Sequence, residues 1–130
     1  MMRIFATILG LTISLTTFAQ NNNFWKLKSV REGAKMTDVS NKESQFVISI
    51  KEKKFSGSVG CNTFKGKLEF IKGNDIIPVK LVNTKAKCPE ELDRLDYAVL
   101  EAINLSDQLI IKEDVAEFYN AGRIVLELNR

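Results

Sequence analysis

Histidine does not occur anywhere in this sequence of 130 residues. Its absence excludes Ser-His-Asp and Cys-His nucleophilic machinery, and it excludes the common metal sites that use imidazole ligands. The 7 glycines are scattered at expected turns and form neither a Walker-type nor a dinucleotide-type pattern. We therefore expect a protein that is not an enzyme, with no catalytic residues, no metal site and no bound cofactor.

A strong excess of charge of one sign is also lacking. The formal net charge is +3, which is too small and too evenly spread to indicate nucleic acid as a partner. The hydrophobic content of 45% and the charged content of 27% are ordinary for a globular protein. The length fits one domain with a single modest core.

The N-terminus has the pattern of an export signal. A short positive region at residues 1–3, which contains Arg3, precedes an apolar run over residues 4–15. Thr17 and Ala19 then occupy the −3 and −1 positions of a signal-peptidase site. This predicts a signal peptide over 1–19 and a mature domain over 20–130. A membrane anchor is the alternative, but the apolar run is short and no stop-transfer pattern follows. No cysteine lies near the cleavage point, so we expect no lipid attachment there. We expect an exported monomer, periplasmic or secreted, that is not a lipoprotein and keeps no membrane span.

Cysteine is scarce, with only Cys61 and Cys88 in the chain. Two cysteines in an exported domain predict a single disulfide. In the chain-entropy model, closing a loop of about 28 residues is worth roughly 3.5 kcal/mol. The alternative is a reactive thiol at Cys88, beside a predicted helix N-terminus and close to Lys85 and Lys87. The lack of a Cys-x-x-Cys spacing favours the disulfide.

The adjacent acids Glu90 and Glu91 are the other candidates for catalytic residues. They could be imagined as an acid and a base, but adjacent residues on a helix point in different directions. Acidic residues in the first turn of a helix are explained by the helix dipole. We therefore assign them no catalytic role.

Hydrophobic periodicity predicts an antiparallel α+β domain. An apolar stripe at Leu92, Leu95, Val99 and Ile103 indicates an amphipathic helix that opens at Pro89. Residues 31–44 show no period and are expected to form a long loop. We expect a curled, barrel-like antiparallel sheet of about seven or eight strands with the helix packed on it. Alternating apolar and polar residues predict strands over 24–30, 45–51, 55–61, 67–71, 76–82, 108–112, 115–119 and 123–128.

Two short motifs resemble the META domain, the HslJ-like family of bacterial envelope proteins. The first is the pattern GCNxFxG, and the second is TxxxC, followed by a glutamate early in a helix. The resemblance covers nearly all of the mature chain, although Lys85-Ala86-Lys87 is basic where members often carry methionine or small apolar residues. The residues that carry it are Trp25, Gly60, Cys61, Asn62, Phe64, Gly66, Thr84, Cys88 and Glu91.

The resemblance implies a small curled sheet with a helix, usually exported or lipid-anchored, and no established catalytic residues. The family is associated with heat response, antibiotic tolerance and, in protozoan members, secretion or motility. Asn62 and Gly66 are expected to shape a turn, with Phe64 packed beneath it and Trp25 anchoring the core.

We therefore expect a non-catalytic, stress-related envelope protein that acts through contacts with an unidentified envelope protein or with the envelope itself. The alternatives are a module that binds a small apolar ligand and a thiol-dependent redox protein.

Overall fold

The computed structural model describes residues 23–72 and 75–130. The predicted signal peptide lies outside these residues. The described part contains nine strands and one helix. In chain order they are β1 (Phe24–Glu32), β2 (Lys35–Asp38), β3 (Gln45–Ser49), β4 (Lys54–Ser58), β5 (Thr63–Phe70), β6 (Ile76–Asn83), α1 (Glu90–Leu105), β7 (Gln108–Ile111), β8 (Val115–Asn120) and β9 (Arg123–Asn129).

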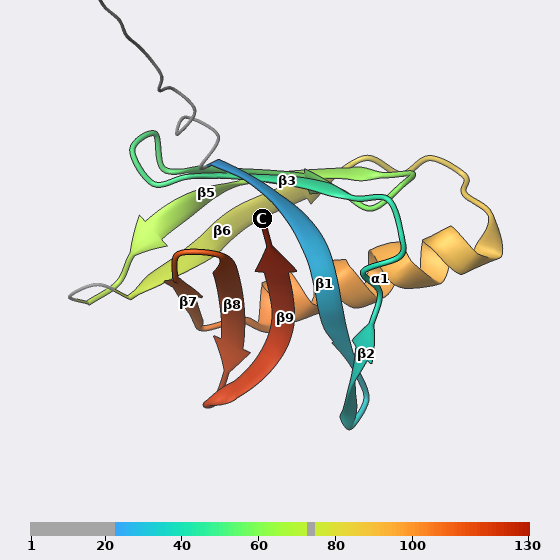
Figure 1. Cartoon of the computed structure of the whole chain (residues 1–130). Coiled ribbons are helices and arrows are strands. Elements are labelled where there is room, and N and C mark those ends of the chain that lie inside the picture. Colours follow the sequence, from blue (N-terminus) through green and yellow to red (C-terminus); the bar gives the residue numbers. More distant parts are fainter. Residues whose placement is uncertain (1–22, 73–74) are drawn as a thin grey trace, which may run out of the picture.

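The strands form one antiparallel sheet that closes on itself (Figure 1). The spatial order is β2-β1-β3-β4-β5-β6-β7-β8-β9, and β1 also pairs with β9. Eight strands therefore make a closed barrel, to which β2 adds a short extension on β1. The predicted α+β class, with a barrel-like antiparallel sheet and one packed helix, is confirmed.

One stretch that was expected to be a loop contains a strand. Strand β1 continues to Glu32, and the chain turns at Gly33, which has a φ of 65°. It then returns as β2, whose Lys35 pairs with Glu32. The prediction of a continuous loop over 31–44 was wrong. Strand β2 has four residues, of which only Met36 is apolar, and none is fully buried, so its sequence shows no alternation of apolar and polar residues.

Aromatic side chains fill the inside of the barrel. Phe46, Phe55, Phe64 and Phe118 are each no more than 1% exposed. The Phe55 ring lies 6.1 Å from that of Phe46 and packs edge-on against that of Phe118 at 5.9 Å. Trp25 is also buried, as its expected core role requires. The alternation seen in the sequence therefore corresponds to one set of side chains that packs inside the barrel.

Helix α1 packs against β1, β6, β8 and β9 (Figure 1). Pro89 precedes its first turn, and the acids of that turn suit the positive end of the helix dipole. Its buried face contains Leu95, Val99 and Ile103, as the apolar stripe predicted. Asp96 is buried on the same face, so a carboxyl group lies between the helix and the sheet.

Gly57 is required by the packing of its cross-strand neighbour. Gly57 on β4 pairs with Phe46 on β3, and a Cβ at position 57 would overlap the Phe46 ring. Gly57→Ala is therefore expected to destabilise the domain by about 1–3 kcal/mol, the usual cost of overpacking a dense core. Urea unfolding measures this loss. Ser56→Ala on the same strand is the control and should change the free energy of unfolding by less than about 0.5 kcal/mol; equal losses in the two variants would contradict the packing argument.

Candidate functional site

The site is built around the turn between β4 and β5. Strand β4 ends at Ser58 and β5 begins at Thr63. Within the turn, Gly60 has a φ of 112°, and a Cβ there would lie 3.2 Å from Leu92 of α1. Glycine therefore satisfies both the backbone conformation and the close approach of the helix. The turn brings Cys61 and Asn62 beside the start of α1.

A disulfide joins this turn to the loop that precedes the helix. Cys61 and Cys88 are bonded, with their Cα atoms 6.1 Å apart. The predicted pairing is confirmed, and among the described residues there is no free cysteine. Both cysteines are half-buried, so the bond lies at the edge of the core and not deep inside it.

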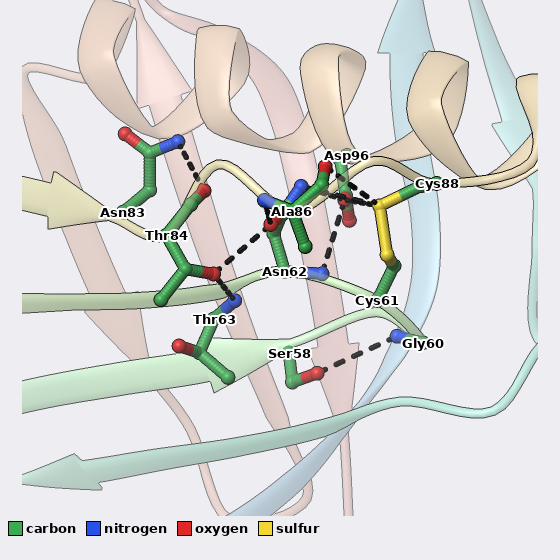
Figure 2. The surroundings of a disulfide bond; sticks show 10 residues. All are labelled: Ser58, Gly60, Cys61, Asn62, Thr63, Asn83, Thr84, Ala86, Cys88 and Asp96. Carbon is green, nitrogen blue, oxygen red and sulfur yellow. Dashed lines mark hydrogen bonds between the residues drawn. A yellow bond between two sulfur atoms is a disulfide. The ribbon is translucent and has the colours of Figure 1, made fainter.

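The Asn62 side chain links three segments of the chain (Figure 2). Its Oδ1 accepts hydrogen bonds from the backbone N–H of Ala86 at 2.8 Å and from the hydroxyl of Thr84 at 3.0 Å. Its Nδ2 donates to Oδ2 of Asp96 at 3.0 Å, and its own backbone N–H donates to the same oxygen at 3.2 Å. Asn62 is only 6% exposed. Beyond its expected role in a turn, it therefore connects the turn, the loop and the helix.

Thr84 of the family motif completes the link between β5 and the loop. Its hydroxyl accepts a hydrogen bond from the N–H of Thr63 at 3.0 Å. Its backbone N–H donates to the carbonyl of Thr63 at 3.1 Å. The hydroxyl thus accepts from Thr63 and donates to Asn62, which explains why a threonine suits this position.

Asp96 is the site residue that sequence reasoning missed. It is 6% exposed, and its Oδ1 is buried without a hydrogen-bond partner among the residues that the structure describes. Burial raises the pKa of the Asp96 carboxyl above its usual range, the two hydrogen bonds from Asn62 oppose the rise, and the charge of Asp93 adds to it. The sequence did indicate its burial, because Asp96 follows Leu92 by four residues and precedes Val99 by three. That spacing places it on the apolar face of the helix.

The disulfide, the amide and the buried carboxyl lie close together (Figure 2). The Sγ of Cys88 is 3.4 Å from Nδ2 of Asn62 and 3.9 Å from Oδ2 of Asp96. A disulfide sulfur carries no proton, so it can only accept from the amide here. We call these four residues, Cys61, Cys88, Asn62 and Asp96, the disulfide centre.

A cleft opens beside the disulfide centre. It has a volume of about 240 Å³, and Asn62 and Asp96 form part of its wall. Lys85, Asp93 and Tyr97 supply the other polar side chains of its lining that can ionise. Asp96 therefore borders a cleft that is open to solvent.

The remaining motif residues lie elsewhere in the fold. Phe64 is inside the barrel, and Gly66 lies within β5 and not in the turn. A Cβ at Gly66 would lie 2.9 Å from the carbonyl oxygen of Val79, so glycine permits the close approach of β6. Glu91 points to Lys42, with an ion pair of 2.8 Å between Nζ and Oε1. The expectation that Gly66 shapes a turn was therefore wrong, because β5 begins earlier than its alternation indicated.

The comparison with protein families agrees with the motif. The protein-family model of the META domain matches residues 16–128. The chain belongs to the META domain family. The match begins within the predicted signal peptide and covers the barrel and its helix. Among curated proteins, none matches this META domain.

Two solved structures share the fold of this META domain. A protein from Burkholderia xenovorans, solved by NMR, matches with a TM-score of 0.64 and 17% identity over 84% of this chain and 81% of that one. A second protein solved by NMR matches with a TM-score of 0.57 and 20% identity over 83% of this chain and 88% of that one. In the described part of the META domain, no helix has the length and apolar character needed to cross a membrane.

Proposed function

We propose that this META domain is an exported protein of the bacterial envelope that acts through contacts of its surface with another envelope protein, in a response to stress, and not as an enzyme. The observation that carries the proposal is the Cys61–Cys88 disulfide. Structural disulfides persist in oxidising compartments and are rare in the cytosol. The signal-like residues 1–19 and the association of the family with heat response support the same compartment and role.

The packing of the barrel favours a surface over an internal cavity for binding. Four phenylalanine side chains occupy the interior, where a small apolar ligand would otherwise have to fit. Outside the barrel, Ile50 and Phe70 are 39% and 42% exposed and line an open groove of about 400 Å³ together with residues of β7. Exposed apolar side chains around a groove are typical of a surface that contacts another protein.

Fractionation of cells that express the full chain tests the compartment. We expect the protein outside the cytoplasm, with its N-terminus at Gln20 and with both thiols blocked in non-reducing mass spectrometry. Recovery in the cytosol with an intact leader would contradict the proposal, and so would free thiols in the exported protein.

Crosslinking in envelope extracts tests the contact. We expect the mature domain to recover a partner protein that the Phe70→Asp variant does not recover. Val82→Asp is the matched control, because Val82 is an exposed apolar residue of β6, at 64% exposure, that does not line the groove. If both variants recover the same proteins as the unaltered domain, the groove is not the contact surface.

A further inference from the structure

We propose that the disulfide centre is a site of thiol–disulfide exchange, in which a thiolate attacks Cys61 and Asp96 gives a proton to the departing sulfur of Cys88. The substrate class is an accessible thiol, on a partner polypeptide or on a small molecule. The inference rests on the geometry of the disulfide centre and not on the surface contact proposed above, so each can fail without the other.

The surroundings of the Cys88 sulfur favour it as the leaving group. The Sγ of Cys88 lies 3.4 Å from Nδ2 of Asn62, whose N–H can stabilise a thiolate as it forms. Cys88 also precedes Pro89 at the positive end of α1, where a thiolate is favoured. A leaving thiol of lower pKa departs faster. Attack on Cys61 therefore places the leaving charge where the protein stabilises it.

Asp96 has the features of a proton donor to that sulfur. Its Oδ2 accepts two hydrogen bonds from Asn62 and lies 3.9 Å from the Sγ of Cys88. Its Oδ1 is buried without a partner in the described part of the chain. An unpartnered buried oxygen is costly for a purely structural carboxylate, whereas a proton on that carboxyl removes the buried charge. Because Oδ2 already accepts two hydrogen bonds, the proton belongs on Oδ1.

The charges that face Asp96 come from three segments. Asp93 on α1 and burial favour the protonated carboxyl, and the hydrogen bonds from Asn62 of the turn favour the ionised form. Lys85 of the loop and Tyr97 of the helix line the same cleft. Burial is the largest of the effects on the pKa, so Asp96 stays protonated to a higher pH than an exposed aspartate does.

The exchange step balances without any other reactant. A bond forms between the incoming sulfur and Cys61 Sγ while the Cys61–Cys88 bond breaks, and its electron pair goes to Cys88 Sγ. The Cys88 sulfur then moves toward Asp96 and takes the proton from its Oδ1. Cys88 becomes a thiol, and Asp96 becomes a carboxylate. The incoming sulfur is oxidised to the disulfide level and Cys88 is reduced. In the reverse step, Asp96 takes the proton back, and the Cys88 thiolate attacks Cys61 and releases the partner.

The kinetics of reaction with reduced glutathione test the proposal. The oxidised mature domain is mixed with excess glutathione between pH 4.5 and 8, and rapid alkylation followed by mass spectrometry reports the rate and the modified cysteine. We expect glutathione on Cys61. At each pH all variants meet the same glutathione thiolate concentration. The rate ratio of the unaltered domain to Asp96→Asn should therefore be about a hundredfold at the acid end, the lower end of the range for a positioned general acid. The ratio should fall toward one as pH rises through the Asp96 pKa.

Controls separate proton donation from loss of structure. Tyr97→Phe changes a residue of the same helix that lines the same cleft. It leaves Asp93 and the hydrogen bonds of Asp96 in place, so it should follow the unaltered domain at every pH. A ratio for Asp96→Asn that does not change with pH would overturn the proposal, as would glutathione on Cys88. Should Asp96→Asn fail to fold, the unaltered domain still decides: its rate per glutathione thiolate must fall as pH rises through the Asp96 pKa, and a constant value overturns the proposal.

Discussion

Replacing Asn62 by alanine is expected to lower the free energy of unfolding by about 2–3 kcal/mol, the upper part of the range for leaving a buried polar group without its partner. The substitution removes the acceptor of the Ala86 N–H and of the Thr84 hydroxyl, together with one of the two donors to Asp96. The carboxyl of Asp96 is then left in the core with a single N–H as its partner. The cost is high because the buried carboxyl of Asp96 and two part-buried groups of the loop lose a partner at once.

Urea unfolding of the oxidised domain measures this loss. Asn83→Ala is the matched control, because Asn83 lies in the same region but makes one exposed hydrogen bond, from its Nδ2 to the carbonyl of Thr84. It should cost less than about 1 kcal/mol, the usual range for a single hydrogen bond. Similar losses for the two variants would show that the loop is not held by Asn62.

Removal of the disulfide is expected to have the second large effect. The double variant Cys61→Ser, Cys88→Ser should unfold with a free energy lower by roughly 3.5 kcal/mol, since the closed loop no longer restricts the unfolded chain. The bonded cysteines are separated by 27 positions, which sets the size of that loop. For a domain of this size, such a loss is a large part of its total stability.

Reduction of the unaltered domain supplies the control for this prediction. Unfolding in excess reductant should give the same free energy as the double variant within about 0.5 kcal/mol, the usual size of an ordinary substitution effect, because both remove the same crosslink. A loss below about 1 kcal/mol in both would contradict the chain-entropy argument, since the unfolded chain would then be restricted even without the crosslink. The effects of Asn62→Ala and of disulfide removal should not add, because both act on the loop over 84–88.

Much of the scaffold could be predicted because its signals are local. The alternation of Phe46 and Ile48 identifies β3, and the stripe at Leu95, Val99 and Ile103 identifies α1. The disulfide followed from the number of cysteines and the expected compartment. These features depend on the period of a few residues or on composition, and both are visible in one sequence.

The parts that escaped prediction depend on contacts between distant segments. Gly66 is needed because β6 approaches β5 closely at the carbonyl of Val79, and nothing near Gly66 in the sequence states this. Asp96 is buried because Asn62, from another segment, offers two N–H groups to its carboxyl. Strand β2 forms because its partner β1 extends beyond its apolar part. Tertiary partners override local preference in all three cases.

The closure of the barrel by β1 and β9 has a consequence for the order in which the chain folds. Leu27 pairs with Leu128, so the first strand of the domain finds one of its partners only when the last strand is present. Contacts of such long sequence separation form late and slowly. A nascent chain that emerges from its N-terminal end therefore cannot close the barrel until β9 has emerged as well. Until then β1 lacks one of its two neighbours in the closed sheet, so the backbone groups on that edge stay unpaired.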